Sequence, residues 1–206
     1  MKVLVACEMS GRVREAFRRK GHEAYSCDIL PAVDESPHHI QDDVSGYLDK
    51  GWDLIIGHPP CTHLSTINSR PMTPEREELR REAFAFFMLI YNADCPRVAV
   101  ENPRGVVARL FRPADQYIHP YMFGEPYQKL TGLWLRGLPL LVPTNWLPDI
   151  HVTDENGRGH RPNRLKWMPT HSIRPGDLSS GGGARNRWMR SLTFLSIAEA
   201  MADQWG

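Results

Sequence analysis

Residues 53–65 read Asp53-Leu54-Ile55-Ile56-Gly57-His58-Pro59-Pro60-Cys61-Thr62-His63-Leu64-Ser65. The apolar run at the start of this stretch predicts a short buried strand, which Gly57 ends. The two prolines fix the backbone and keep the residues before them out of the helical region. Cys61 follows this rigid corner directly. A structural cysteine would lie inside the strand, so a thiol just past the strand end is placed for nucleophilic attack.

Strands and helices alternate on both sides of this stretch. The expected strands cover 2–7, 23–27, 53–57 and 97–101, and the expected helices cover 10–20, 73–90 and 196–204. This alternation predicts an α/β domain with a Rossmann-like, mostly parallel sheet and helices on both faces. Ligands of such sheets bind at the carboxyl ends of the strands.

The composition is that of a soluble globular protein. The 206 residues are 41% hydrophobic and 24% charged, with a net charge of +1 and a mean hydropathy of −0.43. No apolar run approaches the length of a bilayer, and the chain opens on a strand rather than a signal peptide. We therefore expect a cytoplasmic protein with no membrane partner. The four cysteines are widely spaced without a C-x-x-C pair, which favours neither disulfides nor a zinc module.

Differences in local composition divide the chain into three parts. Residues 1–137 form the predicted catalytic core, and 187–206 are a helical segment that returns to it. Residues 138–186, rich in proline and glycine, predict a small irregular extension. Between 156 and 190 the only acid is Asp177, against the basic residues Arg158, Arg161, Arg164, Lys166, Arg174, Arg185, Arg187 and Arg190. With Trp167 and Trp188 interleaved, this cationic stretch (156–190) favours nucleic-acid contact over a merely solvated loop.

The side chains that carry chemistry follow the ends of the expected strands. Ser10 and Gly11 follow the first strand, Asp28 the second, Cys61 the central one, and Glu101 stands at the end of the next. Carboxylates accept hydrogen bonds from ribose hydroxyls and from an adenine amine. The pattern therefore predicts a nucleoside-bearing cofactor beside a reactive thiol.

Simpler interpretations of the same residues stay open. Cys61 could be a buried structural cysteine, or could join His58 and His63 in a metal cluster. Glu101 could be an ordinary exposed acid, and aspartates such as Asp28 and Asp43 are common in turns. Ser65 could support its loop or simply cap a turn.

Two strand ends resemble motifs of one known family. Residues 57–65 resemble the G-x-P-P-C-x-x-x-S nucleophile motif of the DNA cytosine-5 methyltransferases. Val100-Glu101-Asn102-Pro103 is similar to that family's E-N-V motif. Asp28 falls where the family has the acid that holds the cofactor ribose, and Asp43-Val44 is similar to its D-I motif at the adenine.

The resemblance extends more weakly along the rest of the chain. Phe123-Gly124-Glu125-Pro126 resembles the G-x-P that introduces the family's Q-x-R-x-R segment, whose two arginines fall on Lys129 and Thr131. The glycine-rich F-x-G-x-G loop is here Ala6-Cys7-Glu8-Met9-Ser10. Residues 190–205 are similar to a shortened form of the last motif, and the target-recognition domain of the family is reduced to 138–186.

The resemblance implies methyl transfer from S-adenosylmethionine to C5 of cytosine in DNA. Cys61 would attack C6 of a base taken out of the stack, and Glu101 would hydrogen-bond N3 and the exocyclic amine. The resulting site prediction is a list of three groups without a metal: catalytic Cys61, Glu101, Pro60 and Lys129; cofactor-binding Glu8, Ser10, Gly11, Asp28, Asp43 and Pro59; nucleic-acid-binding Ser65, Arg161, Arg164, Lys166, Arg185 and Arg187.

Other functions remain compatible with the sequence. His58-Pro59-Pro60 is similar to the S/N/D-P-P-Y motif of amino-group (N4 or N6) methyltransferases, although those enzymes have an aromatic residue where this chain has Cys61. The chain could also be a catalytically silent nucleic-acid-binding module on a methyltransferase scaffold. Double- or single-stranded DNA is the expected partner, with RNA or a free nucleotide as further options. We expect a monomer or small homo-oligomer, and the brevity of the chain suits a phage protein.

Overall fold

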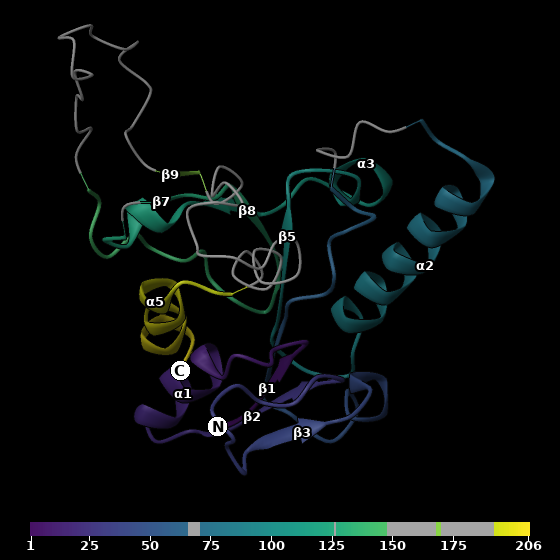
Figure 1. The fold of residues 1–206 in the computed structure, drawn as a ribbon. Helices are drawn as coiled ribbons and strands as arrows, with labels where there is room; N and C mark the ends of the chain where they lie inside the picture. The colour runs from purple at the N-terminus through teal and green to yellow at the C-terminus, as the bar shows by residue number, and fades with distance from the viewer. Residues whose placement is uncertain (66–70, 126, 148–167, 170–191) are drawn as a thin grey trace, which may run out of the picture.

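The fold is built on a seven-stranded sheet with the strand order β3-β2-β1-β4-β5-β8-β6 (Figure 1). The computed structural model describes residues 1–65, 71–125, 127–147, 168–169 and 192–206. The strands of the main sheet are β1 (Lys2–Ala6), β2 (Glu23–Asp28), β3 (His39–Gln41), β4 (Leu54–Gly57), β5 (Val98–Pro103), β6 (Gln116–Ile118) and β8 (Thr131–Arg136). A separate pair joins β7 (Tyr127–Gln128) and β9 (Met168–Pro169). The helices are α1 (Arg12–Arg19), α2 (Pro74–Tyr91), α3 (Val107–Leu110) and α5 (Leu195–Trp205), with short 3-10 turns η1 (Val44–Gly46) and η2 (Pro120–Met122).

The sheet is mostly parallel, as the sequence predicts. Strands β3, β2, β1, β4 and β5 run parallel, whereas β8 runs antiparallel to both of its neighbours. The strand order reverses between β1 and β4, because β2 lies on one side of β1 and β4 on the other. In open α/β sheets the crevice at such a switch point is the usual ligand site.

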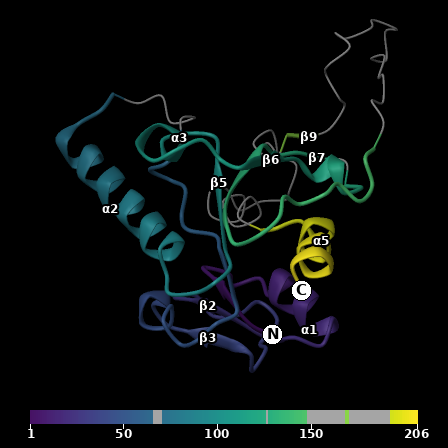
Figure 2. The same cartoon turned by 180° about the vertical axis from the view of Figure 1, so that it is seen from behind.

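Helices cover both faces of this sheet. Helices α1 and α5 lie side by side on one face and α2 lies on the other, as the opposite views in Figures 1 and 2 show. Successive strand residues feed opposite faces, because side chains alternate along a strand. Val3 and Val5 pack with α1 and α5, whereas Leu4 and Ala6 pack in the core on the α2 side.

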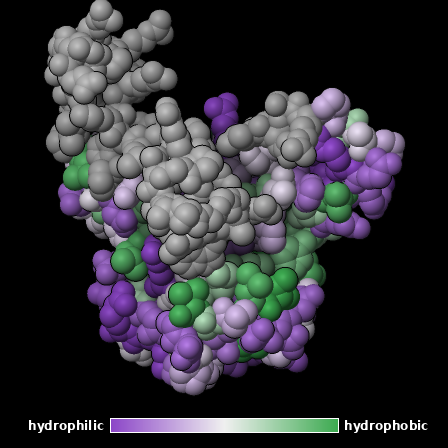
Figure 3. Space-filling model, in the orientation of Figure 1, coloured by the Kyte–Doolittle hydropathy of each residue, from purple (hydrophilic) through white to green (hydrophobic). Residues whose placement is uncertain are grey.

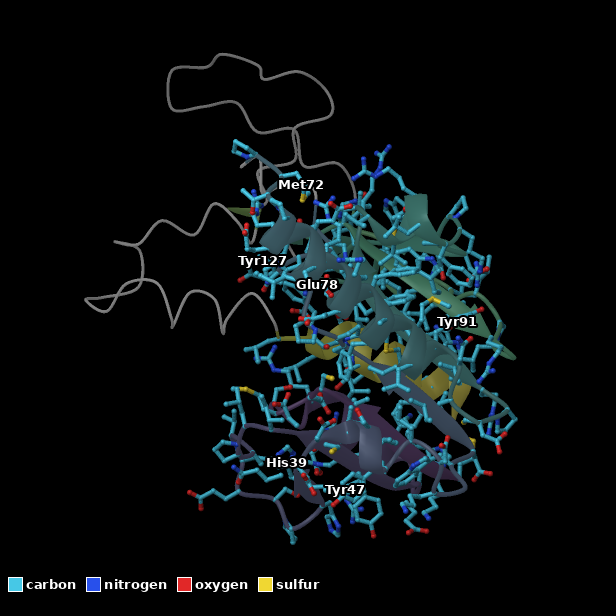
Figure 4. The ribbon with its side chains drawn as sticks, turned by 90° about the vertical axis from the view of Figure 1, so that its right-hand side faces the viewer. His39, Tyr47, Met72, Glu78, Tyr91 and Tyr127 are labelled. Carbon is cyan, nitrogen blue, oxygen red and sulfur yellow. The ribbon has the colours of Figure 1, made fainter. Side chains whose placement is uncertain are left out.

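Helix α2 is defined by its first turn and by its contact with β4. Thr73 accepts a hydrogen bond from the backbone N of Arg76 (3.4 Å), and Pro74 stands at the first helical position. Figure 4 shows Glu78 toward the start of the helix and Tyr91 at its end. A Cβ atom on Gly57 would lie 2.7 Å from Cγ2 of Ile90, so the glycine allows α2 to approach the end of β4 closely.

Helix α5 returns the end of the chain to the first strands. Ile197, Ala200 and Met201 are buried on one face, as predicted, and the two termini lie close together (Figure 1). Arg97 donates to the backbone carbonyl of Trp205 (3.3 Å), which ties the last helix to β5. Within the described ranges, no helix has both the length and the apolarity needed to cross a bilayer.

The segment after residue 137 is described only in part. Leu141 is buried in the core beside α5, and the indole of Trp205 donates to the carbonyl of Pro139 (3.1 Å). Within the predicted extension, residues 148–167 and 170–186 lie outside the described residues. The surface drawn in Figure 3 mixes hydrophilic and hydrophobic residues below the grey region.

Candidate functional site

The predicted site residues gather at one edge of the sheet because of strand direction. Parallel strands β1, β2, β4 and β5 all end at this edge. Predicted site residues lie in the loops after β1 and β4, at the last position of β2 (Asp28) and near the end of β5 (Glu101). Strand β8 runs the other way, so it begins where β5 ends, with Thr131 opposite Pro103. Lys129 precedes β8 by two residues and therefore arrives beside Glu101. The sequence predicts these site residues, but the antiparallel direction of β8 is what places Lys129 beside Glu101.

Glu101 is held between two basic side chains. One carboxylate oxygen, Oε2, lies 2.9 Å from Nδ1 of His58, and the other, Oε1, lies 3.4 Å from Nζ of Lys129. The side chains of His58, Glu101 and Lys129 are 9%, 16% and 22% exposed. The three come from the end of β4, from β5 and from the connection before β8. This arrangement fixes the carboxylate at both oxygens.

The environment of Glu101 keeps its carboxylate ionised. Burial is the largest single influence and raises the pKa of this carboxyl, but the charge of Lys129 and the hydrogen bond from His58, with the other contacts of these two side chains, together outweigh it. The net result is a pKa of about 2, against an ordinary value of 4.5. At neutral pH this side chain therefore accepts hydrogen bonds and does not donate them.

The loop that follows β4 presents Cys61 at the surface and anchors itself on Leu64. Pro59 is buried, whereas Pro60 and Cys61 are exposed. The backbone N atoms of Leu64 and Ser65 donate to the carbonyl of Cys61 (3.1 and 3.0 Å), which closes a tight turn. Leu64 is fully buried, so the thiol is carried on a turn with a hydrophobic anchor.

The Cys61 loop is joined to the segment that follows Glu101. The backbone N of Val106 donates to the carbonyl of Leu64 (2.9 Å), and Ser65 forms an antiparallel bridge with Gly105. The nucleophile candidate and the carboxylate candidate therefore belong to two loops that are fastened to each other. Ser65, predicted as a nucleic-acid contact, takes part in that fastening.

The other three cysteines lie in environments that suppress reactivity. None of the four cysteines of the chain forms a disulfide. Cys27 and Cys95 are buried, and burial raises the pKa of both, to about 11 for Cys27. Burial, followed by the charge of Asp28, raises the pKa of Cys7 far above its ordinary value. Exposure distinguishes Cys61 from all of them.

The loop after β1 contains Glu8, a buried carboxylate that accepts hydrogen bonds from the first turn of α1. Glu8 is 4% exposed, and its Oε1 accepts from the backbone N of Val13 (2.7 Å) and the hydroxyl of Ser10 (3.1 Å). Its Oε2 accepts from the backbone N of Arg14 (3.2 Å). A carboxylate at a helix N-terminus satisfies the free N–H groups and the positive end of the dipole. Glu8 and Ser10, both predicted to bind cofactor, thus serve as the cap of α1.

Backbone conformation in this loop is unusual at two positions. Cys7 has a φ of 59° and Gly11 a φ of 70°, both in the left-handed region. A Cβ atom on Gly11 would lie 2.2 Å from the guanidinium of Arg14, so glycine is required there for space as well as for conformation. The tight path lets the loop turn from the end of β1 into α1.

The carboxylates at the ends of the next two strands, Asp28 and Asp43, differ in exposure and in their local hydrogen bonds. Asp28 is half-buried at the end of β2, where its Oδ1 accepts from the backbone N of Leu30 (2.9 Å). Asp43 is exposed and caps η1 by accepting from the backbone N of Ser45 (2.8 Å), a bond that lowers the pKa of its carboxyl. Both carboxylates can still accept from a ligand, because each oxygen has two lone pairs.

The loop after β2 is fastened over the loop after β1. The backbone N of Val33 donates to the carbonyl of Met9 (2.9 Å). Arg14 is fully buried and forms ion pairs with Asp34 and Glu15, and it donates to the hydroxyl of Ser26 (2.7 Å). Arg14 therefore links α1, β2 and the loop that follows Asp28 in one network.

Two residues of the site were not singled out as site residues from the sequence. The sequence suggests His58 as a possible metal ligand and as part of a motif similar to S/N/D-P-P-Y, but not as a partner of Glu101. In the described part of the chain, no three His, Cys, Asp or Glu side chains are grouped to hold a metal ion. Asn102 is 1% exposed, and neither atom of its amide has a partner among the described residues. The sequence feature that could have identified both residues is their position, since each is next to a predicted site residue at the end of a strand.

Five predicted nucleic-acid contacts lie outside the described residues: Arg161, Arg164, Lys166, Arg185 and Arg187. Their role stays a prediction from the sequence.

Comparison with known proteins gives little beyond the fold. No family model matches the sequence, and no curated protein matches it. A solved structure from E. coli, described as a provisionally assigned DNA modification methyltransferase encoded within a prophage, matches with 18% identity and a TM-score of 0.47. The match covers 71% of this chain, which spans about half (51%) of that chain. At this level of likeness, function has to be argued from the site.

Proposed function

We propose that the chain is an S-adenosylmethionine-dependent methyltransferase that modifies C5 of cytosine in DNA. The observation that carries the proposal is the pairing of two strand-end loops. One presents an exposed cysteine after a Pro-Pro corner, and the other follows an ionised glutamate held by two basic side chains. A thiol and a carboxylate at adjacent strand ends are the two groups that addition to a pyrimidine ring requires.

The strand ends at the switch point fit the nucleoside part of the cofactor. Asp28 lies at the end of β2 with lone pairs available for ribose hydroxyls, and Asp43 follows β3 on the same edge. Pro59, which is buried between the end of β4 and Cys61 in the sequence, would also contact the cofactor. When bound, S-adenosylmethionine supplies an electrophilic methyl group. Gly11 and Ser10 would shape the loop that the cofactor contacts, while Glu8 orders it.

The proposed chemistry begins at Cys61. The thiolate adds to C6 of the base, and the electron pair of the C5–C6 double bond moves to C5 and the ring. Pro60 keeps the sulfur forward by fixing the backbone before it. After transfer, loss of the C5 proton and departure of the thiolate restore the aromatic ring. The target base has to leave the duplex stack to reach the thiol.

Glu101 and Lys129 would hold the base during this addition. Because Glu101 is ionised, it accepts from the exocyclic amine but cannot donate to N3, in contrast to the hydrogen bond to N3 that the family resemblance implies. Lys129 would supply the adjacent donor for the ring edge, where negative charge develops. Ser65 and the basic residues Arg161, Arg164, Lys166, Arg185 and Arg187 would contact DNA, which makes 138–186 the recognition segment of a catalytic core formed by 1–137 and 187–206.

Product analysis tests the proposal. The protein is incubated with methyl-labelled S-adenosylmethionine and cytosine-containing DNA, single-stranded and duplex, and the digested nucleosides are identified by mass spectrometry. We expect labelled 5-methylcytosine from the wild type and from Cys95→Ser, and none from Cys61→Ser. Label on N4 of cytosine or N6 of adenine would contradict the C5 mechanism. Equal transfer by Cys61→Ser would exclude Cys61 as the nucleophile.

The cap formed by Glu8 favours a second candidate, a nucleic-acid-binding protein without catalysis. Its carboxylate accepts from the backbone N–H groups of Val13 and Arg14, which are then not available to an anionic ligand at the start of α1. Calorimetry distinguishes the two functions, because the enzyme binds both S-adenosylmethionine and DNA, whereas the silent module binds DNA alone.

A further inference from the structure

The contact between His58 and Glu101 joins two side chains that are both largely buried. Nδ1 of His58 lies 2.9 Å from Oε2 of Glu101, and the two side chains are 9% and 16% exposed. Among the described residues, the titratable side chains that lie against Glu101 are His58, directly after β4, and Lys129, in the connection before β8. Each of them takes a different carboxylate oxygen.

The chemistry of this contact fixes the hydrogen atom and the ring. An ionised carboxylate can only accept, so Nδ1 carries the hydrogen of this bond. The backbone of His58 is held as well, since its N donates to the carbonyl of Ala6 (2.9 Å) and Pro59 follows it. Nε2 is buried and has no hydrogen-bond partner among the described residues. Among the described residues, the Glu101 carboxylate is therefore the hydrogen-bond partner of the His58 ring.

We propose that His58 is a positioning residue of the base-binding site, whose Nδ1–H fixes one oxygen of Glu101 so that the remaining lone pairs meet the N–H groups of the substrate base. This inference rests on the proposed function for its substrate. With Lys129 alone, the carboxylate would be held at one oxygen and could turn about its last side-chain bond. With His58 as well, both oxygens are fixed before the base arrives, which lowers the reorganisation needed during the reaction.

Two substitutions separate hydrogen bonding from packing. In His58→Asn, the amide nitrogen can occupy the place of Nδ1 and keep the donor. In His58→Leu, a side chain of substantial volume remains but no donor is left. The matched control is His63→Leu, on the same loop, since the structure gives His63 no hydrogen bond to Glu101.

The experiment combines two measurements on the full chain. The first is single-turnover methyl transfer to a cytosine oligonucleotide, with the binding of S-adenosylmethionine measured by calorimetry. The second is a ¹³C NMR titration of the Glu101 carboxyl, which needs no substrate. A residue that serves only packing would not move this titration.

We expect His58→Leu to slow methyl transfer about 10- to 100-fold, the range for losing a hydrogen bond to a charged group, with cofactor affinity unchanged. The same variant should raise the pKa of Glu101 in the titration. His58→Asn and His63→Leu should stay close to the wild type in both measurements. Equal damage by His58→Asn and His58→Leu, or a Glu101 titration that His58→Leu leaves in place, would overturn the inference. A wild type that methylates no base refutes the proposed function instead, and the titration still decides whether His58 holds Glu101.

Discussion

The backbone N of Val106 donates to the carbonyl of Leu64 across 2.9 Å, so the loop that carries Cys61 and the loop that follows Glu101 are fastened to each other. The residues are 42 positions apart in the sequence (106 − 64), yet both are buried, Leu64 at 0% and Val106 at 2% exposure. The spacing between the candidate nucleophile and the candidate base-binding carboxylate thus depends on a shared hydrophobic anchor. Substitutions that loosen this anchor should affect catalysis without touching either reactive group.

Leu64→Ala tests this anchor directly. We expect it to lower the free energy of unfolding by about 2 to 5 kcal/mol, the cost of removing a fully buried leucine side chain. Methyl transfer should fall further than the fraction of folded protein explains, because the Cys61 turn loses its fixed position. Urea denaturation and single-turnover rates measure the two effects. Leu140→Ala, at a position that is 55% exposed, is the control; if it costs as much as Leu64→Ala, the anchor has no special role.

Alkylation by iodoacetamide should select Cys61. Its side chain is exposed, whereas Cys27 and Cys95 are buried and the pKa of Cys7 is strongly raised by burial. Peptide mapping after brief treatment at mildly alkaline pH should place the label on Cys61, and bound 5-fluorocytosine oligonucleotide should block it. Preferential labelling of Cys7 would mean that the loop after β1 opens in solution.

The stability of the chain should depend on pH through Glu101. Its pKa in the folded chain is about 2, below the ordinary 4.5, so the unfolded chain binds more protons between these two values. The stabilisation from the ionised carboxylate is therefore complete above about pH 4.5 and is lost as the pH falls toward 2. The advantage of the wild type over Glu101→Gln, on the order of 3 kcal/mol, should shrink over that range.

Urea denaturation at pH 7, 4.5 and 3 measures this difference. Asp203→Asn, which removes an exposed ion pair with Lys20, serves as the control and should change stability little at any of these pH values. A constant gap between wild type and Glu101→Gln would show that Glu101 gains nothing from its two basic partners.

Asp28→Ala should weaken the binding of S-adenosylmethionine by about tenfold, because it removes an acceptor for the ribose hydroxyls. Asp28→Asn retains a side-chain oxygen that can accept from the backbone N of Leu30, so it separates the local turn from the ligand contact. Calorimetric titration gives both affinities. Unchanged affinity in both variants would remove Asp28 from the cofactor site.

Arg14→Met should destabilise the fold by about 1.5 to 3 kcal/mol, since it removes a buried hydrogen bond to Ser26 and the ion pair with Asp34. Cofactor affinity should fall as well, because the loop after Asp28 loses its tie to α1. Arg19→Met, at an exposed ion pair with Glu199, is the matched change and should cost little. Thermal unfolding with and without S-adenosylmethionine distinguishes the two effects.

Local sequence patterns were sufficient to predict the strands and helices at the centre of the fold. Four strands and three helices follow from apolar alternation, helical spacing and capping residues such as Thr73, and the structure confirms them within a few residues. Strands β3 and β6 are only three residues long, too short for a periodic pattern to stand out from a loop. The second residue of β8 is Gly132, which weakens a strand pattern in the sequence. The position of β8 between β5 and β6 depends on pairing with distant segments.

The α/β class, the strand-end positions of Cys61, Asp28 and Glu101, and the capping of α2 can be predicted from the amino-acid sequence, because each depends on residues near one another in the chain. The contacts of His58 and Lys129 with the two oxygens of Glu101, and the fastening of two loops at Leu64, become visible only in the folded chain. The contacts of His58 and Leu64 arise where the parallel neighbours β4 and β5 end side by side, and the contact of Lys129 arises where antiparallel β8 begins beside the end of β5. Local sequence encodes the conformation of a segment, whereas the partners of a buried carboxylate are set by which distant segments the sheet brings together.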